Sequence, residues 1–183
     1  MSNAPVSTGW RRVTVELTIN GDAETIEGGQ DLASALRQAG YTEVKCGCDG
    51  GACGISKVFV DGELVTACGV DAETAAGAEV ETLASLGDQD DLHPIQQAFV
   101  DNHAVQSGFS TGGFIMSAKA LLEENPNPTE AEVREAIDDV YCRETGYQKP
   151  VEAILDAAER MRDSVATDGG REQTGQTDHG ENQ

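Results

Sequence analysis

The chain has 183 residues, enough for one ordinary domain or two small ones, each with a modest core. Acidic residues number 33 against 12 lysines and arginines, so the formal net charge is −21, and the acidic residues are spread along the chain. Such a charge repels phosphate backbones and anionic lipids, which excludes nucleic acids and membrane surfaces as partners.

The N-terminal half has the two-residue period of β-strands. Within 13–19 every second residue is apolar, which places one face of a strand against a core. The Asn-Gly pair at 20–21 predicts a turn into a short second strand around 25–26. Asp31 is a suitable N-cap for a helix over 32–39, which should end at the following glycine.

Four of the five cysteines fall within residues 46–68. Residues 46–53 read CGCDGGAC, and Cys68 stands alone further on. Thiolates on a glycine-rich loop suit soft metals, and a C-x4-C pair closed by a later cysteine is part of the plant-type iron–sulfur pattern. That pattern has a further cysteine where this chain has Ser56. A reducing cytoplasm makes metal binding a better explanation of these cysteines than disulfides.

A hairpin is predicted directly after the cysteine-rich loop. Residues 57–60 and 63–66 are strand-like and flank an Asp-Gly pair that suits a tight turn. Cys68 lies just past the second of these strands. A last strand around 80–83 would complete a small mixed sheet packed on one helix.

After a polar break at 87–91 the apolar residues follow a helical period. Four short helices are predicted, and together they indicate a bundle. The expected bounds are Pro94 to about Val105, Gly113 to Glu124, the capping box of Thr129 and Glu132 to about Asp139, and Pro150 onward.

These patterns predict an α+β chain with a β-rich domain followed by a helical one. The expected parts are a flexible N-terminus at 1–11, a β-rich domain at 12–87, a linker at 88–92, a four-helix domain at 93–163 and a disordered acidic tail at 164–183. No stretch approaches the ~18 apolar residues of a membrane span, and the start lacks a signal-peptide core, so we expect a cytoplasmic protein. The charge favours a halophilic cytoplasm, with simple high solubility as the alternative.

The order and spacing of several motifs resemble the small iron–sulfur subunit of the molybdenum hydroxylases, the family of xanthine dehydrogenase, aldehyde oxidoreductase and carbon monoxide dehydrogenase. The agreement runs from Val13 to Leu155. It is carried by GCDGGACG at 47–54, HPIQQAF at 93–99 and IMSAKALL at 115–122, with further matches at 125–129, 134–136 and 145–147.

The resemblance implies a plant-ferredoxin-like β-grasp domain with one [2Fe–2S] cluster and a four-helix bundle domain with a second. In the family, electrons pass from molybdopterin in a large subunit through both clusters to a flavin (FAD) subunit or another acceptor. The small subunit performs no substrate chemistry of its own. Gln106 matches a family glutamine near the pterin across the subunit interface; the alternative is an ordinary polar residue at a helix end.

The helical domain departs from the family pattern at its cluster ligands. Serines, Ser107 and Ser110, occupy both positions of the first cysteine pair, and Glu144 replaces the partner of Cys142 in the second. Oxygen ligands suit hard cations rather than a sulfide cluster, so this degenerate site predicts that the second cluster is absent. An oxygen-ligated cluster, or another metal on Cys142, Glu144 and a histidine, is the alternative. We expect the serines to be hydrogen-bonded into the vacated space and Glu144 to reach solvent or pair with an arginine.

In the first domain the resemblance places Cys48, Cys53 and Cys68 on three ligand positions and Ser56 on the remaining one. Cys46 has no counterpart in the family. Either Cys46 supplies the fourth thiolate, which its chemistry favours, or Ser56 ligates through oxygen. A zinc site on the four thiols and a metal-free loop are further alternatives.

Two functions therefore stay open. The first is an electron-transfer subunit with one [2Fe–2S] cluster, working with a molybdopterin-binding large subunit and a flavoprotein. The second is a scaffold that keeps the docking surfaces of the family without a redox role.

Overall fold

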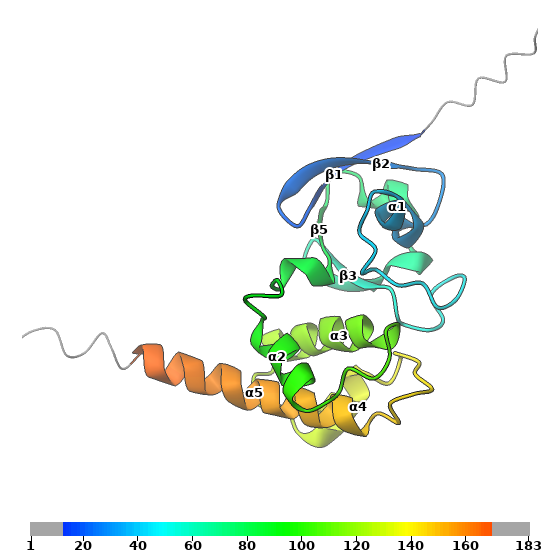
Figure 1. The fold of residues 1–183 in the computed structure, drawn as a ribbon. Coiled ribbons are helices and arrows are strands. Elements are labelled where there is room, and N and C mark those ends of the chain that lie inside the picture. Colours follow the sequence, from blue (N-terminus) through cyan, green and yellow to red (C-terminus); the bar gives the residue numbers. More distant parts are fainter. Residues whose placement is uncertain (1–12, 170–183) are drawn as a thin grey trace, which may run out of the picture. The chain divides into compact units, whose positions relative to one another are not determined.

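The computed structural model describes residues 13–169. The predicted N-terminus at 1–11, and residues 170–183 of the predicted tail, lie outside the described residues. Backbone contacts divide the chain between Ser85 and Leu86, and the predicted linker at 88–92 begins just after this division. The first unit holds a five-stranded sheet and one α-helix, and the second holds four α-helices (Figure 1). Across 13–169, no helix is both long and apolar enough to cross a membrane.

The sheet of the first unit is mixed, as predicted. Its strand order is β2-β1-β5-β3-β4. The β1 strand is antiparallel to β2 and parallel to β5, and β3 is antiparallel to both β4 and β5. The bounds are β1 (Thr14–Ile19), β2 (Asp22–Glu27), β3 (Lys57–Val60), β4 (Glu63–Thr66) and β5 (Glu79–Glu81).

The alternation read from the sequence matches the burial of β1. Val15, Leu17 and Ile19 are all buried in the core of the first unit. Both predicted hairpin turns have the left-handed backbone that Asn-Gly and Asp-Gly tolerate, with φ values of 53° and 90° at 20–21 and of 50° and 82° at 61–62. Turn chemistry and side-chain period thus fix the register of both hairpins.

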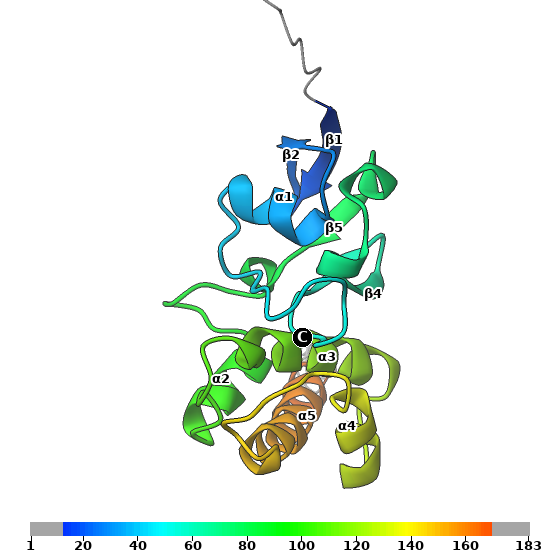
Figure 2. The ribbon, with the colours of Figure 1, turned by 90° about the vertical axis from the view of Figure 1, so that its right-hand side faces the viewer.

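Among the described residues of the first unit, α1 (Leu32–Gln38) is the one α-helix, and it lies beside the sheet (Figure 2). Asp31 caps it, because its carboxylate accepts a hydrogen bond of 2.9 Å from the Ser34 N–H. Leu32 and Leu36 are fully buried and join the core formed with β1. Three 3₁₀-helices follow at Ala67–Gly69, Ala72–Ala75 and Leu83–Ser85. The last of these ends the β-structure, so the final strand stops at Glu81 rather than near residue 83.

The second unit packs three helices against its longest one. The bounds are α2 (Pro94–Asp101), α3 (Ser110–Glu124), α4 (Glu130–Ala136) and α5 (Gln148–Gly169). The helices α2, α3 and α4 all contact α5, which Figure 2 shows almost end-on. Phe99, Phe114 and Ile154 are fully buried and come from α2, α3 and α5.

Three of these helices end elsewhere than expected. The α4 helix ends at Ala136 rather than near Asp139. The sequence predicts that α2 continues to about Val105, but it ends at Asp101 because His103 takes a left-handed conformation with φ 55°. In the other direction, α5 continues past residue 163, where the sequence placed the end of the helical domain, to Gly169. Neither proline nor glycine interrupts the chain between Val151 and that glycine.

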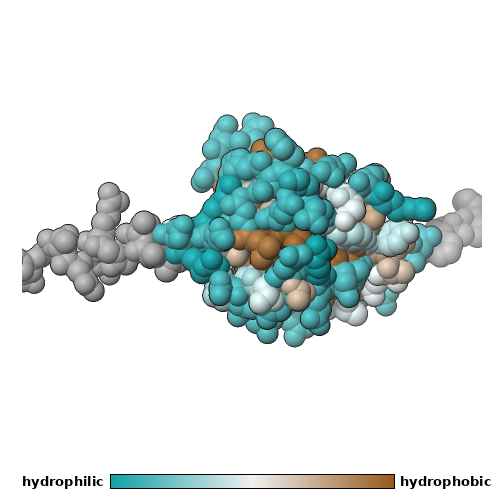
Figure 3. Space-filling model, turned by 90° about the horizontal axis from the view of Figure 1, so that it is seen from below, coloured by the Kyte–Doolittle hydropathy of each residue, from teal (hydrophilic) through white to brown (hydrophobic). Residues whose placement is uncertain are grey.

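Charged side chains cover much of the surface. On the face in Figure 3, hydrophilic residues predominate and surround a narrow apolar strip. One ion-pair group ties α2 to α5: the Arg160 guanidinium lies 2.6 Å from the Asp101 carboxylate and 2.7 Å from that of Asp156. Because these groups are partly exposed, their effect on stability is small compared with the buried core.

Candidate metal centre

The loop at 45–56 carries three cysteines between α1 and β3, and Cys68 lies in the 3₁₀-helix after β4. Backbone packing brings the loop to the fourth cysteine: a Cβ added at Gly51 would lie 3.6 Å from the Cα of Gly69. Gly51 also has φ +88°, a conformation that side-chain-bearing residues rarely adopt. A glycine here lets the loop approach the residue that follows Cys68.

Three of the thiols affect one another's pKa. Contacts with Cys53, and then with Cys68, lower the pKa of the Cys48 thiol. Burial raises the pKa of Cys53, and its contact with Cys48 raises it further. Gly47 lies against the same thiol, since an added Cβ would stand 3.2 Å from the Cys53 Sγ. The electrostatics of Cys48 are thus linked to both Cys53 and Cys68.

Cys46 lies close to this group but in a different environment. Burial raises the pKa of its thiol, the nearby Arg37 guanidinium opposes this, and the negative charges of Cys68, Asp31 and Cys53 add to it. The charges of two of these cysteines therefore act on the Cys46 thiol.

Ser56 already has a structural partner. Its side chain is 0% exposed, and its Oγ accepts a hydrogen bond of 3.1 Å from the backbone N–H of Cys68. Its carbonyl oxygen also accepts from the N–H of Ala67 at 2.8 Å. Ser56 therefore fastens the segment that carries Cys68 to the start of β3.

The four thiols of this region are suitable ligands for an iron–sulfur cluster, and four thiols also suit a structural zinc site. Thiolates are the usual protein ligands of such clusters, and all four cysteines here are free of disulfides. Along 13–169, however, no three His, Cys, Asp or Glu side chains are grouped so that they could hold a metal ion. Metal binding at Cys46, Cys48, Cys53 and Cys68 thus stays a prediction.

The residues predicted for the degenerate site come together in the second unit. The Ser110 hydroxyl donates to the Cys142 Sγ at 3.1 Å, and this thiol lies 3.9 Å from a carboxylate oxygen of Glu144. Ser107 is buried, and its Oγ accepts from the N–H of Ser110 at 3.4 Å. The expectation that both serines are hydrogen-bonded here is confirmed. Glu144 reaches solvent, which is one of its two predicted states.

Two further residues complete this site and were not predicted. The Thr145 hydroxyl donates to the Cys142 Sγ at 3.3 Å, and the Cys142 N–H donates to the Tyr147 hydroxyl oxygen at 2.9 Å. Burial would raise the pKa of Cys142, but hydrogen bonds from Ser110, Thr145 and two backbone N–H groups outweigh it and lower the pKa. Common hydroxyl residues a few positions from a cysteine give no distinctive sequence signal.

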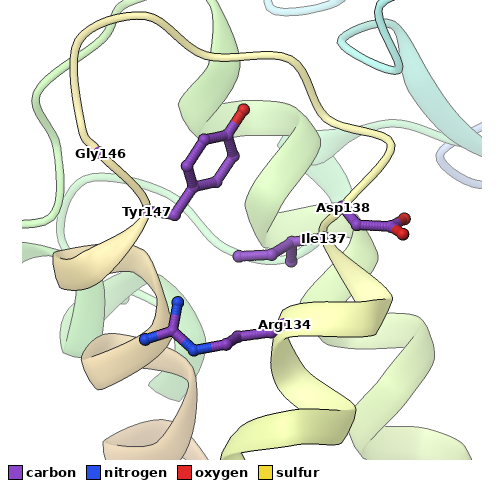
Figure 4. Close-up of a pocket in the computed structure, with 5 residues that line it drawn as sticks. All are labelled: Arg134, Ile137, Asp138, Gly146 and Tyr147. Carbon is purple, nitrogen blue, oxygen red and sulfur yellow. The ribbon is translucent and has the colours of Figure 1, made fainter.

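A pocket of about 360 Å³ borders this site. Its lining residues are Arg134, Ile137, Asp138, Gly146 and Tyr147 (Figure 4). The Asp138 carboxylate points away from the Arg134 guanidinium in this view, and the Tyr147 hydroxyl is already bonded to Cys142.

Gln106 is exposed, and its side-chain amide donates to the carbonyl of His103 at 3.0 Å.

Comparison with known proteins identifies a domain family and close relatives. Residues 81–155 match the family described as [2Fe–2S] binding domain. The chain is 43% identical over 149 residues to the nicotine 6-hydroxylase small subunit of Paenarthrobacter nicotinovorans, covering 80% of this chain and 90% of the relative. It is 39% identical over 152 residues to the nicotinate dehydrogenase small FeS subunit of Eubacterium barkeri, covering 81% and 97%.

The fold is also similar to solved structures. The aldehyde oxidoreductase of Desulfovibrio desulfuricans ATCC 27774 matches with a TM-score of 0.78 and 42% identity. The match covers 82% of this chain but only 17% of that chain, so the similarity spans a small part of a much longer protein.

Proposed function

Because the chain belongs to the family of small iron–sulfur subunits of molybdenum hydroxylases, we propose that it is the electron-transfer subunit of a molybdopterin-dependent hydroxylase or dehydrogenase. In this proposal it carries one [2Fe–2S] cluster, held in the first unit. Substrate chemistry belongs to a molybdopterin-binding partner, and a flavoprotein with FAD is a further partner. We place the complex in the cytoplasm, where reduced thiols remain available for metal binding.

The observation that supports the proposal is the approach of the glycine-rich loop to the segment of Cys68, where a Cβ added at Gly51 would lie 3.6 Å from the Cα of Gly69. Cys48 and Cys53 lie in the glycine-rich loop before the hairpin of β3 and β4, and Cys68 follows that hairpin. A cluster bound there would supply a one-electron carrier. Cys46 is the fourth ligand in the proposal, because a thiolate binds iron better than the bonded hydroxyl of Ser56 does.

The relatives support a molybdopterin-containing partner. Two are named as small subunits, and another similar protein, an aldehyde oxidoreductase, is a far longer chain of which this sequence matches only a part. In the proposal, Gln106 contacts the pterin of the large subunit, and its exposed position leaves it available for an interface.

Iron and acid-labile sulfide counts on anaerobically purified protein test the proposal. We expect about two irons and two sulfides per chain. The Cys48→Ser variant should lose them, because this residue is at the centre of the thiol group. Zinc in place of iron, or iron that Cys48→Ser retains, would contradict the cluster at this loop.

A scaffold subunit is the second candidate, and the state of Ser56 favours it. A buried serine bonded to Cys68 stabilises the loop without any metal. Purification with the large subunit distinguishes the two functions. A stable complex without iron supports the scaffold, whereas a complex whose iron is reduced by the substrate supports electron transfer.

A further inference from the structure

The segment that matches a [2Fe–2S] binding domain holds too few ligands for such a cluster. Residues 81–155 contain one cysteine, Cys142, and two histidines, His93 and His103. A [2Fe–2S] cluster takes four cysteines, or two cysteines and two histidines. Even if both histidines were recruited, the segment would supply three of the four ligands.

The two histidines also have other surroundings. The Nδ1 of His93 accepts a hydrogen bond of 3.2 Å from the Ile95 N–H and so caps α2. Lys119 and Glu123 of α3 act on its charge. His103 is exposed in the turn that follows α2. His93 caps α2 and His103 lies in a surface turn, and neither role brings the imidazole to the Cys142 thiol.

Instead, the Cys142 thiol is the centre of a protein-only network. It is 9% exposed and accepts hydrogen bonds from the hydroxyls of Ser110 and Thr145 at 3.1 and 3.3 Å. Ser110 is the first residue of α3, so the thiol joins the segment at 141–147 to the start of that helix. The Tyr147 ring packs edge-on against Phe114 of α3, with the ring centres 5.9 Å apart, which adds a second connection between the same two segments.

We propose that the helical unit of this chain binds no iron–sulfur cluster, and that the hydrogen-bond network centred on Cys142 instead fastens the segment at 141–147 to α3. The missing thiols at Ser107, Ser110 and Glu144 are what removes the cluster from this unit. The lowered pKa of Cys142 agrees with this role, because the hydroxyl and backbone donors around the sulfur stabilise its thiolate form. The proposal concerns the second unit alone, so it holds whether or not the cysteine loop of the first unit binds iron.

Variants of Cys142 test both parts of the proposal in the full chain. The Cys142→Ser and Cys142→Ala variants should keep the iron and sulfide content of the wild-type protein. The alanine removes the acceptor of two buried hydroxyls, and we expect its melting midpoint to fall by about 4–8 °C or more. Loss of iron from either variant would contradict the statement that the helical unit binds no cluster. An unchanged melting midpoint of Cys142→Ala would contradict the structural role of the network. Cys48→Ser is the matched control, because it acts on the first unit only.

Restoring the thiols gives a second measurement that does not depend on iron in the wild-type protein. The triple variant Ser107→Cys, Ser110→Cys, Glu144→Cys surrounds Cys142 with three further thiols. After anaerobic reconstitution with iron and sulfide, we expect it to hold about two more irons per chain than the wild type treated in the same way. A folded triple variant that gains no iron would overturn the statement that the missing thiols remove the cluster. Loss of iron confined to Cys48→Ser would instead report on the proposed cluster of the first unit.

Discussion

At the scale of single residues, Ser56 and Cys46 exchange the roles that the family pattern would give them. Ser56 stands in a ligand position, yet its hydroxyl accepts the Cys68 N–H in a fully buried place. Cys46 has no family counterpart, yet it interacts with the clustered thiols. A hydroxyl must lose its proton to ligate iron, which is much harder for serine than for cysteine. We therefore expect the hydroxyl to be structural and the extra thiol to be the ligand.

Substitution of each residue separates these roles. Ser56→Ala should retain the iron and visible absorbance of the protein but lower its stability by about 1–3 kcal/mol, because the Cys68 N–H loses its buried acceptor. Cys46→Ser should lose the iron with little other change, since this side chain is only partly buried. Metal analysis and thermal melting check both results. The opposite pattern, iron lost from Ser56→Ala and kept by Cys46→Ser, would show that the serine is the fourth ligand.

At the scale of elements, the start of α2 depends on the protonation of His93. Its Nδ1 accepts the Ile95 N–H at 3.2 Å, which only the neutral ring can do. Burial lowers the pKa of His93 from its ordinary 6.5, the charge of Lys119 lowers it further, and Glu123 opposes the shift. The folded chain therefore binds this proton less readily than the unfolded chain. The stabilisation that the neutral ring provides by capping α2 is present in full well above pH 6.5, and it is lost as the pH falls below that value.

The pH dependence of unfolding in His93→Asn tests this coupling. Asparagine can cap a helix at any pH in this range, so between pH 8 and about pH 5 the variant should lose less stability than the wild type does. The difference should approach the value of one N-cap, about 1 kcal/mol. His103→Asn, at the exposed turn after α2, is the control and should leave the difference unchanged. Parallel pH profiles of wild type and His93→Asn would contradict a role for protonation at this cap.

Local chemistry explains which elements the sequence could predict. The hairpins follow from Asn-Gly and Asp-Gly turns, and the capping box of α4 follows from Thr129 and Glu132, whose side chain accepts the Thr129 N–H at 2.7 Å. The sequence did not predict where α3 begins. The helix starts at Ser110, three residues earlier than expected, and there the Thr111 hydroxyl donates a hydrogen bond to the Ser107 carbonyl at 2.6 Å. Glycines at 112–113 weaken the helical signal at that point, and nonlocal contacts decide it.

In the candidate sites, too, the sequence predicts the residue types but not all of the contacts between them. Spacing identified the cysteine loop, and the predicted hairpin of β3 and β4 brings Ser56 near Cys68, but the hydrogen bond from the Cys68 N–H to the buried Ser56 hydroxyl gave no sequence signal of its own. In the second unit, only the family pattern indicated that Ser110 and Cys142 meet, because 32 residues separate them in the chain. The hydroxyl of Thr145 reached the thiol without any sequence signal. Short-range patterns give the ligand types, while tertiary packing determines which donors and acceptors meet.

At the scale of the whole molecule, the net charge of −21 should make stability depend on salt. Self-repulsion among the acidic residues opposes the compact state, and added ions screen it, since the Debye length falls from about 10 Å at 0.1 M to about 3 Å at 1 M. We expect the melting midpoint of the purified chain to rise over this range of sodium chloride, as a halophilic cytoplasm would require. Most of the rise should occur below about 0.5 M, because the screening length changes most at low ionic strength. Potassium chloride should give the same curve, since screening depends on ionic strength rather than on the cation. A midpoint that is flat or falls with salt would contradict the halophilic interpretation, and a strictly linear rise would indicate general salting-out in place of screening.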